Sequence, residues 1–440
     1  MPQVATVLLA LMAGMPRPAH ASALHEAAFE LAQASEVVAV LTVSCQGCSW
    51  AAKGREGAVL LVSVDGRHSQ HLILSRGEGP APYEVTLGAL KRGAHRLTVT
   101  LDRTTTPAGV GASVLGVETR ASPPDDPEHV ALAHAPRLYA RPDTIGRFSD
   151  VPLLMWYESE RTTRGTWLRY SVIFSNEDGG TPTDRLMATW GRVTDIEYVY
   201  GVELDAAGRI LAEEYQGPEH EMLPFRGRRD GRHPRLWVVT RNNMVSDRGA
   251  TKERYAPAPV PFRLDDVSRE AVMDANPWTY RVSDEEMLRE ERIDESARPG
   301  SGRIPDPRRF VYLEACGELE EATLAFDVAV NGGGGTQWIE SDGGLAGVRI
   351  ARSGCFRGAV ALPPGVDDIR LEALRFRAYT RSPREGEPAS PKGKATARLF
   401  RVNRLFRLGP DHEPGPSLLR WQGEAALAPD GAWFELPIPR

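Results

Sequence analysis

The chain has 440 residues, of which 41% are hydrophobic and 25% are charged, values typical of globular domains rather than of disordered or fibrous chains. At roughly 150 residues per domain, this length predicts about three domains. The formal net charge is −6, and because dedicated nucleic-acid binders are usually basic, we expect no nucleic-acid partner. The 42 glycines and 34 prolines favour short strands joined by turns, and so a mainly β, multi-domain fold of antiparallel β-sandwich modules.

Residues 1–23 have the pattern of a signal peptide. An apolar run over residues 4–14 is followed by small residues in the A-x-A arrangement of a cleavage site. No lysine or arginine precedes the run, so the alternatives are a start further upstream or a buried helix. No other segment approaches the roughly 20 apolar residues of a membrane span. We therefore expect a secreted or periplasmic protein without a transmembrane segment.

The chain contains four cysteines, Cys45, Cys48, Cys316 and Cys355. In an exported chain an even number predicts disulfides, and the spacing favours the pairs Cys45–Cys48 and Cys316–Cys355 among the three connectivities that four cysteines allow. The alternative for Cys45 and Cys48 is a redox or zinc motif. That alternative lacks support, because the pair sits in a strand-rich segment and no second CxxC supplies further zinc ligands.

Turn and linker signals divide the rest of the chain into modules. Short strands recur at the spacing that is typical of β-sandwiches, and a Pro-rich linker over residues 122–127 separates the first two modules. We expect an N-terminal β-sandwich of accessory or carbohydrate-binding type (36–120), a central β-rich module that carries the candidate site (130–262), a helical connector (264–300) and a C-terminal β-sandwich (308–440). In the connector, Ser283 and Glu286 predict a capping box that opens a helix.

The most informative segment is an acidic strand over residues 195–205. Strand alternation would place Asp195, Glu197, Glu203 and Asp205 on one face and the apolar residues between them on the other. Neighbouring carboxylates on one face lie roughly 6.5–7 Å apart at their Cα atoms. Such a pair can hold a divalent cation, or divide the roles of general acid and base as in glycosidases. The alternative is the solvated face of an amphipathic strand.

Further candidate site residues lie near this strand. His220 follows a turn between acidic residues and is a candidate general base or metal ligand, although a lone surface histidine is often inert. A cluster of arginines suits bidentate capture of carboxylate or phosphate, and so predicts an anion clamp facing the acidic strand, unless it is a solvated loop. The expected substrate-binding residues are Arg226, Arg228, Arg229 and Arg232, and Arg235 belongs to the same cluster. Trp190 is a further candidate, either as an aromatic platform for a sugar or as a core residue.

Residues 130–250 resemble the necrosis-inducing protein family and its relatives among the vacuolar-protein-sorting-like proteins. The likeness rests on residues 134–139, 149–152, 167–176, 191–197, 203–208, 233–234 and 237–243, in that order. The segment 191–197 corresponds to the family's glycine–histidine–aspartate–tryptophan–glutamate signature. The resemblance implies a secreted β-sandwich whose acidic motif holds a divalent cation and which docks on membrane sphingolipid glycans. The carry-over reaches Asp195 and Glu197 only, because the histidine positions hold Arg192 and Thr194.

The sequence contains no GxSxG elbow, HExxH motif or P-loop, so covalent serine, zinc-peptidase and nucleotide chemistry lack support. We expect a secreted protein that recognises an extracellular, anionic polysaccharide and that, if it is an enzyme, cleaves it as a hydrolase or lyase. Asp195, Glu197 and His220 are the candidate catalytic residues, and Asp195 and Glu197 the candidate ligands of Ca²⁺ or Mg²⁺. The alternatives are a non-enzymatic protein that binds cell-surface or membrane glycolipid, and a structural envelope protein.

Overall fold

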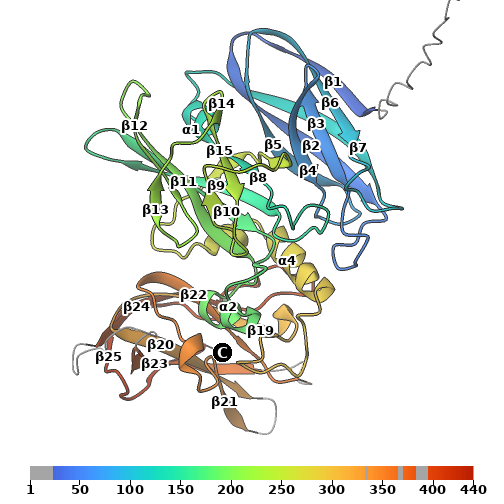
Figure 1. The fold of residues 1–440 in the computed structure, drawn as a ribbon. Helices are drawn as coiled ribbons and strands as arrows, with labels where there is room; N and C mark the ends of the chain where they lie inside the picture. Colours follow the sequence, from blue (N-terminus) through green and yellow to red (C-terminus); the bar gives the residue numbers. More distant parts are fainter. Residues whose placement is uncertain (1–22, 332–334, 365–369, 383–394, 440) are drawn as a thin grey trace, which may run out of the picture.

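A computed structural model describes residues 23–331, 335–364, 370–382 and 395–439. Within these residues the fold is mainly β, with six sheets that form three two-sheet units along the chain (Figure 1). Residues 1–22 of the expected signal peptide (1–23) lie outside the described residues. Among the helices of the described ranges, none is long and apolar enough to cross a bilayer.

The N-terminal sandwich includes residue 23, the first described residue, and so extends before the expected boundary at residue 36. Its strands are β1 (Ala23–Leu31), β2 (Ser35–Gln46), β3 (Val59–Val64), β4 (Arg67–Ile73), β5 (Ala81–Leu90), β6 (Gly93–Leu101) and β7 (Gly111–Ser122). One sheet has the order β1-β6-β3-β4 and the other β5-β2-β7. Asp65 and Gly66 join β3 to β4 with φ values of 50° and 73°, the left-handed conformation that makes Asp-Gly a hairpin signal.

The central module packs two sheets around an apolar core that includes Tyr170, Phe174 and Leu236. Its elements are α1 (His129–His134), β8 (Arg137–Tyr139), β9 (Pro152–Arg161), β10 (Thr166–Phe174), α2 (Thr183–Trp190), β11 (Asp195–Leu204), β12 (Ile210–Gln216), β13 (Met222–Pro224), β14 (Arg229–Asp230), β15 (His233–Val238), β16 (Val245–Ser246), β17 (Arg254–Tyr255) and β18 (Pro259–Pro261). The larger sheet has the order β13-β12-β11-β10-β9-β18. The smaller sheet has the order β14-β15-β8-β17, with β16 paired to β15.

The connector contains α3 (Ala271–Ala275) and α4 (Trp278–Arg289). The expected capping box is wrong, because Ser283 and Glu286 lie inside α4 and are both buried. The helix begins directly after Pro277, whose φ of −58° is already helical and which has no N–H that needs a partner. The polar pattern that suggests a helix start therefore belongs to a helix surface buried between modules.

The C-terminal sandwich has a core that includes Phe326, Phe356 and Phe376. Its elements are η1 (Pro307–Arg309), β19 (Phe310–Glu320), β20 (Ala322–Asn331), β21 (Thr336–Glu340), η2 (Ala346–Val348), β22 (Gly354–Ala361), β23 (Arg370–Thr380), β24 (Thr396–Phe406), β25 (Trp421–Leu427) and β26 (Phe434–Pro437). The sheet orders are β22-β19-β24-β25 and β21-β20-β23-β26. Figure 1 shows this sandwich separated from the other two modules by α2 and α4.

Both expected disulfides are confirmed. Cys45 pairs with Cys48 at the end of β2, and Cys316 pairs with Cys355. Cys316 and Cys355 stand directly opposite each other on the paired strands β19 and β22, so the disulfide crosslinks two neighbouring strands of one sheet.

Candidate functional site

A β-bulge in β11 determines where the acidic side chains point. Tyr200 lies opposite Tyr170 on β10, but Tyr198 lies opposite the next residue, Ser171, so Val199 has no partner of its own. Because an extra residue reverses the alternation of faces, Asp195 and Glu197 lie on the same face as Tyr200, toward the core of the central module. The structure therefore differs from the single acidic face expected from the sequence.

Asp195 and Glu197 are buried, with exposed fractions of 2% and 9%. Asn243 Nδ2 donates to Asp195 Oδ2 at 3.0 Å. Burial raises the pKa of Asp195, and burial together with the charge of Asp195 raises the pKa of Glu197 well above its usual range. The same two causes raise the pKa of Glu177, which follows β10, to about 7. The three carboxyls form a cluster with reduced acidity, which we call the buried acid cluster.

Arginine supplies the positive charge of this cluster. Arg192 Nη1 lies 3.8 Å from Asp195 Oδ1, and Arg192 Nε lies 3.2 Å from Glu270 Oε1, with all three side chains buried. A guanidinium stays protonated and offers no lone pair to a metal. Among the described residues, no group of three or more His, Cys, Asp or Glu side chains is arranged to hold a metal ion. The residues around Asp195 and Glu197 therefore do not fit a divalent cation.

His220 lies on the surface near the buried acid cluster but does not contact it. Its two ring nitrogens lie 3.0 Å from Gln216 Nε2 and 3.3 Å from Asn242 Nδ2. Asn242 precedes Asn243, which binds Asp195, so one short segment separates the histidine from the buried carboxyls. The structure thus brings Asp195 and Glu197 together and leaves His220 outside, held by amide groups.

A second arrangement of polar groups forms an open cavity of about 930 Å³ at the outer side of the smaller central sheet, next to β4 of the N-terminal sandwich. We call it the basic pocket. Six cationic residues line it, together with a single acidic residue, Asp247, whose Oδ2 accepts a hydrogen bond from the Arg226 backbone N–H at 2.8 Å. The cationic residues are Arg226, Arg228, Arg235, Arg248, Lys252 and Arg254.

An aromatic pair forms one wall of the basic pocket. The rings of Tyr139 and Trp237 stack with their centroids 4.7 Å apart. The loop after β16 covers the indole, because a Cβ on Gly249 would lie 2.1 Å from Trp237 Cγ, and Trp237 Nε1 donates to the Thr251 carbonyl at 3.3 Å. With Trp237 only 9% exposed, the pair supports the wall rather than offering a free ring face to a ligand.

The predicted arginine clamp is divided between two places. Arg226 and Arg228 line the basic pocket, whereas Arg229 pairs with Glu213 and donates to Tyr200 Oη at 3.3 Å. Arg232 is exposed and does not line the basic pocket. Trp190 ends α2 beneath the guanidinium of Arg352, 5.3 Å from its ring centre, and does not line the basic pocket either.

Arg248, Lys252 and Arg254 were not predicted as site residues. They lie on the segment after β16, and the pairing of β16 with β15 and of β17 with β8 brings that segment to the pocket. The only feature of the sequence that could have pointed to them is that these three basic residues lie close together, between residues 248 and 254.

No family model matches this chain, and no curated protein matches it. Among solved structures, the chain is similar to "NLPPya in complex with mannosamine" with 14% sequence identity and a TM-score of 0.24, over 32% of this chain and 76% of that chain. This is a remote likeness to a necrosis-inducing-like protein. At that TM-score it supports no conclusion about the fold or the ligand of this chain.

Proposed function

We propose that this protein recognises an anionic polysaccharide and that the basic pocket is its binding site. The observation that supports this most directly is the composition of the pocket wall, where six cationic side chains accompany one carboxylate. The chain as a whole has a net charge of −6, so the positive charge is local to this cavity. A local cationic cavity on an acidic protein favours a specific anionic ligand over general attraction to polyanions.

The six cations differ in how far they are already neutralised. Asp230 pairs with both Arg235 and Arg254. Within the described residues, no ion pair engages the side chains of Arg226, Arg228 or Lys252. The guanidinium groups of Arg226 and Arg228 can bind carboxylates and sulfates through two parallel hydrogen bonds, and Lys252 adds a single positive charge, so the three side chains suit the uronate or sulfate groups of a polysaccharide.

The low exposure of the Tyr139 and Trp237 rings bears on whether the pocket prefers charged or neutral polysaccharides. Because Tyr139 and Trp237 have little exposed ring surface, binding depends on charge rather than on stacking against sugar rings. We therefore expect neutral polysaccharides to bind poorly. Asp195 and Glu197 are buried and do not line this pocket, so we assign recognition to it and no cleavage step to these carboxyls.

The test is binding of polygalacturonate, with neutral dextran as the matched polymer, to the wild-type protein and to the double variant Arg226→Gln/Arg228→Gln. Each charge-assisted hydrogen bond contributes about 1.5–3 kcal/mol, so we expect the double variant to bind polygalacturonate at least about tenfold more weakly. Binding should also weaken as salt is raised, because it is electrostatic. Isothermal titration calorimetry at two ionic strengths measures both effects.

The matched control is Arg103→Gln, which removes an exposed charge from the N-terminal sandwich and should bind like the wild type. Equal binding of polygalacturonate by the double variant and the wild type would overturn the proposal, as would equal binding of dextran. Binding to glycolipid vesicles without binding to free polysaccharide would instead favour the membrane-glycolipid alternative.

A further inference from the structure

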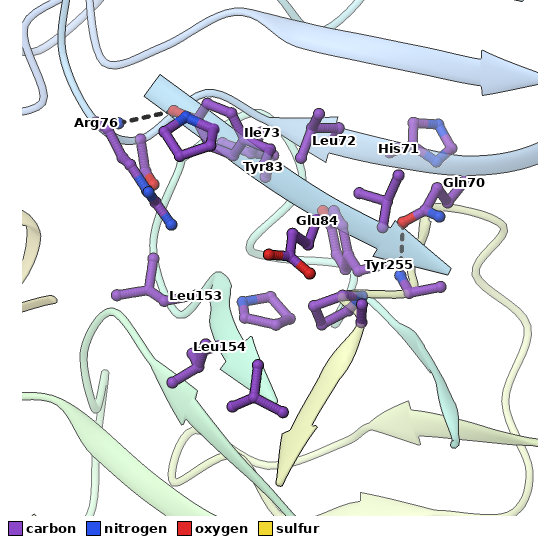
Figure 2. A pocket seen from close by; sticks show the side chains of 18 of the residues that line it. Gln70, His71, Leu72, Ile73, Arg76, Tyr83, Glu84, Leu153, Leu154 and Tyr255 are labelled. Atoms are coloured by element: carbon purple, nitrogen blue, oxygen red, sulfur yellow. Dashed lines mark hydrogen bonds between the residues drawn. The ribbon is translucent and has the colours of Figure 1, made fainter. Parts of the chain in front are cut away.

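A separate pocket of about 260 Å³ lies between the N-terminal sandwich and the other modules (Figure 2). Residues of β4 and β5 form one side, and residues of β9, β18 and the start of α4 form the other. We call it the inter-module pocket. It shares no lining residue with the basic pocket. Its volume is slightly below the roughly 300–1,000 Å³ of typical small-molecule sites, so a compact ligand fits it.

Arg76 is the cation of this pocket. Its guanidinium carbon lies 3.6 Å from the centre of the Trp278 ring and 5.1 Å from that of Tyr83. The Arg76 backbone is fixed at both ends, since its N–H donates to Tyr83 Oη at 3.1 Å and its carbonyl accepts from Arg281 Nη2 at 2.8 Å. The head group is therefore held in place by two aromatic rings and an anchored main chain.

The guanidinium of Arg76 has no acceptor in the part of the chain that the structure describes. Among the described residues, no hydrogen bond or ion pair engages it, and its Nε is buried without a partner. Burial lowers the pKa of Arg76 to about 10, which leaves it charged at neutral pH. A buried N–H donor without an acceptor is costly, and here that donor is Nε, since the side chain as a whole is only partly buried. Because the rings position this group at the pocket, an anionic group of a ligand is the acceptor that fits.

Glu84 supplies an opposite charge at the same pocket. Figure 2 shows its carboxylate directed into the hollow, as is the Arg76 head group. The two side chains form no ion pair with each other. Glu84 Oε2 lies 3.7 Å from Arg120 Nη2, and this pair is open to solvent, with side chains 44% and 54% exposed. His71 also lines the pocket, and burial lowers its pKa, so it adds no charge at neutral pH. The lining is thus one cation and one anion, which disfavours a dianion such as phosphate.

The rest of the lining is largely apolar. Leu153 and Leu154 face the hollow from the central module, opposite the two charged groups (Figure 2), and Val260 also lines it. We propose that the inter-module pocket binds an α-amino acid with an apolar side chain. Arg76 receives the carboxylate, Glu84 receives the ammonium group, and the apolar wall receives the side chain. This site is independent of the basic pocket.

The experiment titrates the full chain with L-leucine and with its deaminated analogue 4-methylpentanoate by isothermal titration calorimetry. We expect L-leucine to bind and the analogue to bind at least about tenfold more weakly, because it lacks the group that Glu84 receives. Arg76→Met should abolish binding of both compounds. Glu84→Gln should weaken L-leucine about tenfold and leave the analogue unchanged.

Two exposed residues of the N-terminal sandwich provide controls, and Arg92→Met and Glu30→Gln should bind L-leucine like the wild type. Arg76→Met should still bind polygalacturonate, which shows that the variant is folded and separates this site from the basic pocket. L-leucine binding that survives Arg76→Met would overturn the proposal, as would its absence in the wild type. Equal affinity for both compounds, with no effect of Glu84→Gln, would overturn the role of Glu84 and the zwitterionic ligand.

Discussion

Arg192 shows how one side chain can decide the chemistry of a buried acid cluster. It lies 3.8 Å from Asp195 and 3.2 Å from Glu270, at a position where the resembled signature has histidine. A neutral histidine can donate a lone pair to a cation, whereas a guanidinium neutralises the carboxylates directly. The positive charge that a divalent ion would supply beside Asp195 is here supplied by the Arg192 side chain.

The buried acid cluster makes stability depend on pH through Glu177. Its pKa is about 7 in the folded state, against 4.5 for the free side chain. The folded state therefore holds this proton more tightly, and stability falls as pH rises from about 4.5 to about 7, by at most about 1.4 kcal/mol per pH unit. Glu177→Gln removes this dependence, so its stability relative to the wild type should increase over that range, as measured by urea unfolding at pH 5 and pH 7.5.

Glu221→Gln is the control for this prediction, because Glu221 is an exposed glutamate of the same module. Its stability should follow the wild type at both pH values. Parallel pH profiles for Glu177→Gln and the wild type would mean that Glu177 titrates alike in the folded and unfolded chain.

At the scale of single elements, the extent of β11 was predictable and its faces were not. Its apolar and polar residues indicate a strand over 195–205, and β11 spans Asp195–Leu204. Both faces of β11 are buried, one by the central core and the other by an apolar cluster that reaches the C-terminal sandwich. The alternation of apolar and polar residues therefore does not indicate which side chains face the central core. The bulge at Val199 then reverses the alternation.

The residues of the basic pocket were also predictable only in part. Arg226 and Arg228 were predicted from their local clustering. Lys252 was not, because its place at the pocket depends on β17 pairing with β8, more than a hundred residues earlier in the chain. Contacts of this kind leave no periodic pattern in the sequence.

The position of Ser283 inside α4, rather than at its start, leads to a prediction about stability. An N-cap serine contributes about 0.5–2 kcal/mol, so Ser283→Ala would be clearly destabilising if Ser283 opened the helix. In the structure Ser283 lies inside α4, and its Oγ is buried without a partner among the described residues. Since alanine has the better helix propensity, we expect Ser283→Ala to be neutral or stabilising in thermal unfolding. A loss of about 1 kcal/mol or more would contradict the structure of α4.

At the scale of the whole molecule, the connector joins all three modules through buried polar contacts. Glu286 on α4 accepts a hydrogen bond from Trp50 Nε1 of the N-terminal sandwich at 3.1 Å. On the other side of α4, Asp284 Oδ2 lies 2.6 Å from His412 Nδ1 of the C-terminal sandwich. Because one helix contacts both the N-terminal and the C-terminal sandwich, we expect the modules to unfold together rather than as separate domains.

Arg357 offers the sharpest test of this coupling. It is fully buried on β22, where its Nη2 lies 2.7 Å from Asp274 of the connector and 2.5 Å from Glu314 of β19. Removing one partner from a buried ionic group costs about 3–5 kcal/mol, so Arg357→Met should destabilise the protein by that amount. Asp274 would then keep Arg404 of β24 as its partner in the C-terminal sandwich but lose the fully buried one, so the coupling weakens. We expect differential scanning calorimetry to resolve two transitions where the wild type shows one.

Arg398→Met is the matched control, because Arg398 pairs with Glu318 on the surface of the same sandwich, with exposed side-chain fractions of 50% and 56%. Exposed pairs contribute about 0–1 kcal/mol, so this variant should unfold in one transition close to that of the wild type. If Arg357→Met also unfolds in a single transition at the wild-type temperature, the ionic contacts of Arg357 do not couple the modules. Cooperative unfolding would then have to come from the apolar contacts that α2 and the connector make with the C-terminal sandwich.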